Sequence, residues 1–122
     1  MLLDSNILIY GADGGSPGLD AILDRTDLAV ASVTRIETLG FHRLQAIHRH
    51  WLEVTMERMR TLALDEPVIG RAIALRQERK MGLADAIIAA TALVHGLRLV
   101  TRNVTDFEHV AGLQLVNPFE NV

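Results

Sequence analysis

The sequence contains no cysteine, so its 122 residues form no disulfide bond and no metal site built on thiolates. No apolar run approaches the roughly 20 residues that a membrane-spanning helix needs. The opening MLLD has neither the basic segment nor the apolar stretch of a secretory signal peptide. Repeats, low-complexity tracts and linkers are also absent. We therefore expect a single domain over residues 1–122, located in the cytoplasm, with no membrane partner.

An excess of basic charge is missing as well. Twelve Lys and Arg stand against fifteen Asp and Glu, a net charge of -3, whereas nucleic-acid-binding proteins typically carry a basic patch. Lys80 is the one lysine among the twelve, and arginine is the better bidentate partner for phosphate. Genome composition explains this preference at least equally well. The hydrophobic content of 49% indicates a substantial buried core.

Short apolar runs alternate with helical patterns along the chain. The apolar runs predict buried strands at 2–4, 28–32, 61–64, 97–101 (more narrowly 98–101) and 113–116. Helical patterns cover residues 17–25, a segment from 33 or 34 onward, an apolar stripe from Phe41 to Met59, and residues 65–80 and 83–95. This alternation predicts an α/β domain with a parallel sheet.

Four acidic residues fall where open parallel sheets place their functional crevice, beyond the carboxyl ends of the strands. Asp4 ends the first predicted strand, and Asp106 follows the LRLVT strand. Glu37 lies in the helix after the second strand, and Asp85 lies in the first turn of the helix that leads into LRLVT. Each alone has an ordinary explanation as a helix-start carboxylate, a loop cap or part of a solvated face. Together they would repel one another unless protons or cations intervene, and oxygen-only ligands favour Mg²⁺ or Mn²⁺.

Other metal or phosphate sites find no support in the sequence. His48 and His50 differ by about 200° around a helix, and His42 and His48 by about 240°, so neither pair shares a face as a zinc-binding pair would. The glycines between residues 14 and 18 lack G-x-G-x-x-G spacing, and they predict a flexible turn.

Four segments in order resemble the PIN domain: LLDSNILIY, SVTRIETLGF, LADAIIAATALVHGLRLVTRNVTDF and LQLVNPF. Among PIN domains, the chain is similar to small bacterial toxins of the VapC and FitB type, and the similarity runs from Leu2 to Phe119. The resemblance implies a three-layer α/β/α fold with a five-stranded parallel sheet of order 3-2-1-4-5. It also implies a metal-dependent endoribonuclease that leaves 5′-phosphate and 3′-hydroxyl ends.

The resemblance assigns roles residue by residue. It makes the catalytic residues, and the ligands of Mg²⁺ or Mn²⁺, Asp4, Glu37, Asp85 and Asp106. It places supporting polar residues at Ser5 or Asn6, and at Thr101 and Asn103. Ser5 stands where threonine is common, which keeps the hydroxyl. Independently of the resemblance, the basic side chains near these acids that could steer RNA are Arg35 and Arg102, although an ordinary solvated surface role is the simpler interpretation of both.

Toxins of this type pair with a cognate antitoxin and form homodimers, so the resemblance implies both partners. The candidates for an antitoxin groove or a dimer surface are Leu39, Phe41, Ile47 and Trp51. A plain core stripe is the simpler interpretation of most of these four residues.

Two rival functions remain in view. A phosphatase or a receiver domain also places an Asp after strand one, but the phosphatase D-x-D has Asn6 at its third position. A receiver domain needs a lysine at the end of a late strand, and this chain has Arg102 there. A PIN module that only binds RNA or a partner protein would keep the same acids, and the sequence leaves this alternative open.

Overall fold

The structure, a computed structural model, describes residues 1–120 and contains one five-stranded sheet in the order β3-β2-β1-β4-β5. Its strands are β1 (Leu2–Leu3), β2 (Ala29–Ala31), β3 (Arg60–Leu62), β4 (Leu99–Val100) and β5 (Leu115–Val116). Every neighbouring pair runs parallel. The predicted fold class and strand order are confirmed.

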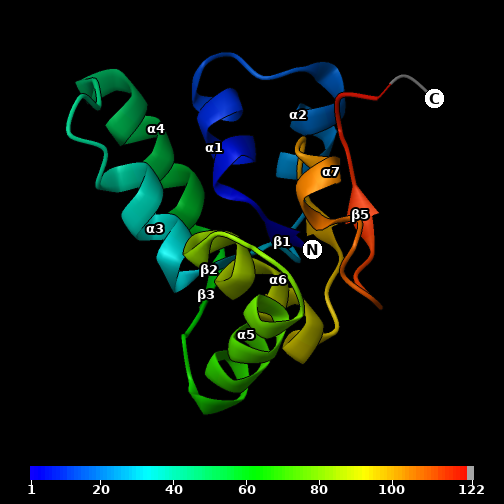
Figure 1. The fold of residues 1–122 in the computed structure, drawn as a ribbon. Coiled ribbons are helices and arrows are strands. Elements are labelled where there is room, and N and C mark those ends of the chain that lie inside the picture. The colour runs from blue at the N-terminus through cyan, green and yellow to red at the C-terminus, as the bar shows by residue number, and fades with distance from the viewer. Residues whose placement is uncertain (121–122) are drawn as a thin grey trace.

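Seven helices connect the strands within residues 1–120 (Figure 1): α1 (Ser5–Ala12), α2 (Pro17–Leu23), α3 (Ser32–Leu39), α4 (Ala46–Glu57), α5 (Glu66–Glu78), α6 (Leu83–His95) and α7 (Val104–Phe107). Their ends follow local signals. Ser16 caps α2 by accepting a 3.2 Å hydrogen bond from the Leu19 N–H. Gly96 ends α6 with a φ of 64°, a left-handed conformation that glycine adopts without strain. None of these helices is long and apolar enough to cross a bilayer.

Alternation along the strands divides the core into two clusters, one on each face of the sheet. Leu2 and Leu99 pack with the buried residues of α5 and α6. Leu3 and Val100 belong to the other cluster, with residues of α1, α2 and α4. All four side chains are fully buried. The result is the expected three-layer arrangement, with the helices of Figure 1 on both faces of the sheet.

The structure corrects the apolar stripe expected from Phe41 to Met59. The helix begins only at Ala46, and its buried residues are Leu52, Thr55 and Met56. Phe41 is 53% exposed and Ile47 is 73% exposed, so the core interpretation is wrong for both. The error arises because the i, i+3, i+4 count starts in a turn, where helical periodicity does not apply, and this rotates the inferred buried face.

Two helices add to the expected set and matter for the site. α1 begins directly after Asp4, which is its N-cap, and α7 begins directly after Asn103. Asp106 lies in the first turn of α7, and Asp85 lies in the first turn of α6. Three of the four predicted acids therefore cap a helix or lie in its first turn, where the free N–H groups favour negative charge.

Candidate active site

Asp4 is held in a fixed position at the carboxyl end of β1. The Ser5 N–H donates a hydrogen bond of 2.7 Å to its Oδ1. The Thr101 hydroxyl, just beyond β4, donates one of 2.8 Å to its Oδ2. Asp4 is only 3% exposed and Thr101 is fully buried. Because β1 and β4 are neighbours in the sheet, two residues that are far apart in sequence orient one carboxylate.

The environment of Asp4 disfavours its charge. Burial raises the pKa of Asp4 to about 6, and the nearby carboxylates of Asp85 and Glu37 add to the increase. The hydrogen bonds from Thr101 and Ser5 act in the opposite direction, since they stabilise the ionised form. A positive charge at this position would relieve both the burial and the repulsion.

The environment of Asp85 also disfavours the charged form of its carboxyl group. It is partly buried, and this burial raises its pKa. The carboxylates of Asp106 and Glu37 raise that pKa further. The charges of Asp106 and Glu37 thus act on Asp85, while those of Asp85 and Glu37 act on Asp4. These interactions connect the four predicted acids into one electrostatically coupled group.

Ser5 joins two of these acids. Its backbone N–H bonds Asp4, and its hydroxyl donates a hydrogen bond of 2.5 Å to Oε1 of Glu37 on α3. Glu37 itself is exposed, so solvent can reach its second carboxylate oxygen.

The other supporting residues contribute unequally. The backbone N–H of Asn103 donates a 3.0 Å hydrogen bond to the Thr101 hydroxyl, and this fixes the direction in which Thr101 donates to Asp4. Among residues 1–120, the amides of Asn6 and Asn103 make no side-chain hydrogen bond. Both residues are half-buried.

Asp85 and Asp106 line a hollow of about 200 Å³ together with residues that the sequence analysis missed: Arg79, Lys80, Thr105 and His109. Nε2 of His109 is buried there without a hydrogen-bond partner among residues 1–120. A positional signal was available, because Arg79 and Lys80 lie four and three residues before Leu83, the first residue of α6. The two cations are exposed and line the same hollow as Asp85 and Asp106.

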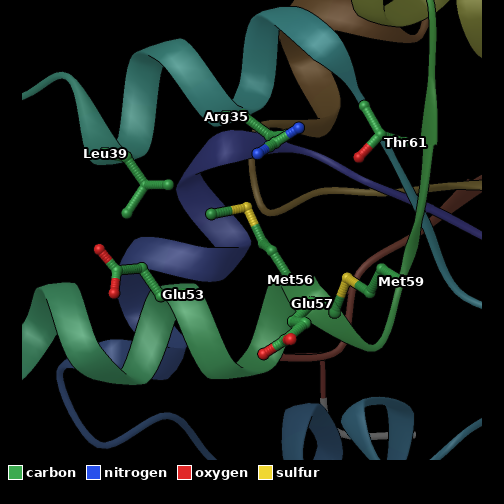
Figure 2. A pocket seen from close by; sticks show the side chains of 7 residues that line it. All are labelled: Arg35, Leu39, Glu53, Met56, Glu57, Met59 and Thr61. Carbon is green, nitrogen blue, oxygen red and sulfur yellow. The ribbon is translucent and has the colours of Figure 1, made fainter.

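Arg35 lies elsewhere. It lines a hollow of about 400 Å³. Figure 2 shows this hollow between α3 and α4, with Leu39 of α3 and Met56 of α4 also pointing inward. Glu53 and Glu57 line the same hollow, whereas none of the four predicted acids does. The structure thus brings Arg35 together with two other carboxylates, and its steering of RNA stays a prediction. Arg102, in contrast, directly follows Thr101.

The four residues considered for partner surfaces lie at different places on the structure. Leu39 lines the hollow of Figure 2. Phe41 lines a different hollow of about 380 Å³ between α1 and α4, and Glu37 of α3 lines it as well. Trp51 is partly buried, and Ile47 lies open on the surface. They do not form one stripe.

The donor chemistry of the acidic group fits a hard divalent cation, since every candidate ligand is a carboxylate oxygen. As they stand, however, no three His, Asp or Glu side chains within residues 1–120 form a closed metal-binding cluster. Glu37 and Asp106 are exposed, and the Ser5 hydroxyl bonds Glu37, whereas Asp4 is buried and held by two hydrogen bonds. The group therefore consists of one buried carboxylate with more exposed carboxylates around it.

Known proteins resemble this chain in both sequence and fold. The PIN domain family model matches residues 1–113. Ribonuclease VapC22 of Mycobacterium tuberculosis is 33% identical over 88 residues, which cover 68% of each chain. VapC ribonuclease Y4jK of Sinorhizobium fredii is 50% identical over 40 residues, and this stretch spans only 33% of this chain and 28% of the relative. A chain of a toxin-antitoxin complex from Klebsiella pneumoniae superposes with a TM-score of 0.80 at 31% identity, with 98% of each chain covered.

Proposed function

The chain belongs to the PIN domain family, and from this premise we propose that it is a metal-dependent endoribonuclease that hydrolyses phosphodiester bonds of RNA. Asp4 carries the proposal. It is a buried carboxylate with a pKa raised to about 6, fixed by two hydrogen bonds and surrounded by acids that raise this pKa further. Such an arrangement is costly for the protein alone, and a bound cation explains it.

In this proposal Asp4, Glu37, Asp85 and Asp106 hold Mg²⁺ or Mn²⁺. The bound cation supplies charge neutralisation for the phosphoryl oxygens and lowers the pKa of the attacking water. Thr101 and Ser5 orient the Asp4 carboxylate, and Ser5 also holds Glu37 beside it. Arg79 and Lys80 line the hollow of Asp85 and Asp106, where they attract the phosphate backbone toward an otherwise repulsive site.

We also propose that the chain is the toxin of a toxin-antitoxin pair, that it acts in the cytoplasm, and that it forms a homodimer. The Klebsiella pneumoniae neighbour, which is a toxin-antitoxin complex, supports the antitoxin. The hollow between α1 and α4 is the surface we assign to the antitoxin, because exposed Ile9 and Phe41 line it and Glu37 connects it to the acidic group. Co-expression with the protein encoded beside it, followed by co-purification of wild type and a Phe41→Asp variant, tests this assignment.

Cleavage of a mixed RNA pool by the purified protein tests the activity. Wild type should cleave with Mg²⁺ or Mn²⁺, and both EDTA and the Asp85→Asn substitution should abolish cleavage. Equal cleavage by wild type and variant, or cleavage insensitive to EDTA, would refute the assignment. Binding of RNA without cleavage in any divalent metal would instead identify a non-catalytic module. A phosphoryl group trapped on Asp4 would favour the phosphotransfer alternative.

A further inference from the structure

Three side chains from distant parts of the sequence meet around Arg102, the residue that follows Thr101. Cζ of Arg102 lies 4.8 Å from the ring centroid of Tyr10 and 4.6 Å from that of Phe119. The two ring centroids are 5.3 Å apart, with an interplanar angle of 65°. Tyr10 belongs to α1, Arg102 follows β4 and Phe119 follows β5. We call these three residues the Arg102 cluster.

The guanidinium is not enclosed by the two rings. Rings on opposite faces would place their centroids about 9 Å apart at normal stacking distances, whereas these lie 5.3 Å apart. Both rings therefore occupy one side of Arg102 and leave its other side open. Arg102 is exposed, and it forms no ion pair with any residue of the range 1–120. Its charge is thus available to an anion from outside.

The cluster is ordered before any ligand arrives. Oδ1 of Asn117 accepts a 3.0 Å hydrogen bond from the Phe119 N–H, and this fixes the turn that carries the ring. The Thr101 N–H donates a 2.9 Å hydrogen bond to the Val116 carbonyl, and this connects the segments on which Arg102 and Phe119 lie. Gly18 of α2 packs so closely against the Pro118 carbonyl that a side chain would not fit there. Pre-ordering of this kind lowers the entropy that a ligand must overcome.

The cluster is also close to the fixed carboxylate. Arg102 directly follows Thr101, which bonds Asp4. Tyr10 is six residues after Asp4 along α1, an axial distance of about 9 Å. Tyr10 is 37% exposed, so part of its ring is open to a planar ligand. A strand of RNA with one phosphate at the acidic group would have its next nucleotides within reach of this surface.

We propose that the Arg102 cluster is a nucleotide-binding subsite, in which the guanidinium pairs with an RNA phosphate and the Tyr10 ring stacks on an unpaired base. This inference rests on the proposed ribonuclease function. Guanidinium and phosphate form bidentate hydrogen bonds. Aromatic rings and arginine planes are the groups on which proteins stack splayed RNA bases. The subsite would hold the strand next to the scissile bond without choosing a particular base.

RNA with a single missing base tests the stacking directly. A single-stranded oligonucleotide that wild type cleaves is labelled, and an abasic nucleotide is placed at each position around the cut. Affinities are measured by fluorescence anisotropy with Mg²⁺ in the Asp85→Asn protein, which should not cleave. We expect one abasic position to weaken binding about 5- to 100-fold. Addition of Tyr10→Leu should cause a similar loss on intact RNA and remove the sensitivity to that abasic position.

Matched variants separate the subsite from general effects. Arg102→Lys keeps the charge but loses the bidentate, stacked geometry, and it should weaken binding, whereas Arg98→Lys, before the amino end of β4, should change affinity less than about twofold. Phe41→Leu controls for the loss of an exposed ring on another surface. Tyr10→Phe, which keeps the ring, should bind as the parent protein does.

The outcomes are distinguishable. If wild type cleaves no RNA, the proposed ribonuclease function fails, whatever the cluster does. If wild type cleaves but no abasic position weakens binding, the subsite is refuted while the ribonuclease stands. If Tyr10→Leu lowers thermal stability yet leaves RNA affinity unchanged, the cluster only tethers the segment around Phe119 and the subsite is likewise refuted. The abasic series in the Asp85→Asn protein needs no change to the cluster, so it can refute the subsite even if a cluster variant fails to fold.

Discussion

Thr101 donates its hydroxyl hydrogen to Oδ2 of Asp4 over 2.8 Å and accepts the backbone N–H of Asn103 over 3.0 Å. A single buried hydroxyl therefore joins the end of β4 to the carboxylate at the end of β1. Both of its interactions are directional, so the hydroxyl hydrogen must point at Asp4. The ionised form of Asp4 gains stability from this bond, although burial opposes the charge.

The first prediction concerns this hydroxyl. Thr101→Val removes the donor to Asp4 and leaves the Asn103 N–H without its acceptor, so the free energy of unfolding should fall by about 1–3 kcal/mol. The pKa of Asp4 should rise further, and cleavage should fall about 10- to 100-fold. The pH dependence of cleavage should shift to higher pH. Thr91→Val is the matched control, since Thr91 is also buried but bonds only the Ile87 carbonyl. Equal losses in both variants would mean that the Asp4 contact has no special role.

The second prediction concerns the stability cost of Asp4. Folding raises its pKa from 3.8 to about 6, so the folded protein holds this proton more tightly than the unfolded chain does. Protonated Asp4 therefore contributes stability that is fully present below about pH 4 and is lost as the pH rises through about 6. Asp4→Asn, which stays neutral, should therefore raise the free energy of unfolding at pH 7 by about 1–3 kcal/mol and give no such gain at pH 4.

Urea denaturation across pH 4 to 8, without divalent metal, measures this effect. The exposed Asp24→Asn is the control and should change stability by less than about 0.5 kcal/mol. The stabilised Asp4→Asn protein should no longer cleave RNA. A constant difference between Asp4→Asn and wild type at all pH values would contradict the raised pKa.

The third prediction joins metal to pH. Below about pH 6 Asp4 carries a proton and is a poor ligand, so Mg²⁺ should stabilise the protein at pH 8 and much less at pH 5. At a concentration one hundred times the Kd the gain at pH 8 is about 2.7 kcal/mol. Thermal unfolding with and without Mg²⁺ measures it, and Asp85→Asn should reduce the shift. A shift that is equal at pH 5 and pH 8 would place the cation away from Asp4.

Much of this site is predictable from sequence because its signals are local. A strand end, a helix start and a carboxylate occur together at Asp4, and the rule that ligands bind beyond the carboxyl ends of parallel strands places Asp106 at the same edge. The bounds of α6 follow from Gly96 and from the uniformly apolar pattern before it. Local signals of this kind survive folding unchanged, because neighbouring residues create them.

What could not be predicted depends on contacts between distant segments. Phe119 contacts Tyr10, a residue more than a hundred positions away in the sequence. No hydrophobic periodicity in the sequence predicts this contact. Arg35 is two residues from Glu37 in sequence, yet it lines a different hollow, since two helical positions differ by about 200°. Phe41 lies before α4, which begins at Ala46. The sequence pattern does not mark where α4 begins, so the exposure of Phe41 could not be predicted.

The fourth prediction compares two glycines. A Cβ on Gly18 would collide with the Pro118 carbonyl, whereas a Cβ on Gly70 meets nothing within 4 Å. Gly18→Ala should lower the free energy of unfolding by about 1–3 kcal/mol and separate Phe119 from Arg102. Gly70→Ala, within α5, should raise it by about 0.5–1 kcal/mol through better helix propensity. Chemical denaturation of both variants measures these two opposite changes in the free energy of unfolding. A Gly18→Ala protein as stable as wild type would show that the turn at Pro118 adjusts easily.

The fifth prediction concerns the two cations at the rim of the hollow that Asp85 and Asp106 line. If Arg79 and Lys80 each contact an RNA phosphate, Arg79→Gln with Lys80→Gln should weaken RNA binding uniformly across sequences. The slope of log affinity against log salt should become less steep by about 1.4, because each contact with single-stranded nucleic acid contributes about 0.7. Arg60→Gln with Arg98→Gln removes the same charge at the amino ends of β3 and β4, the opposite edge of the sheet. Since net charge changes equally in both double variants, an equal loss of slope would show that only overall charge matters, whereas a loss confined to the first pair places the RNA backbone at the start of α6.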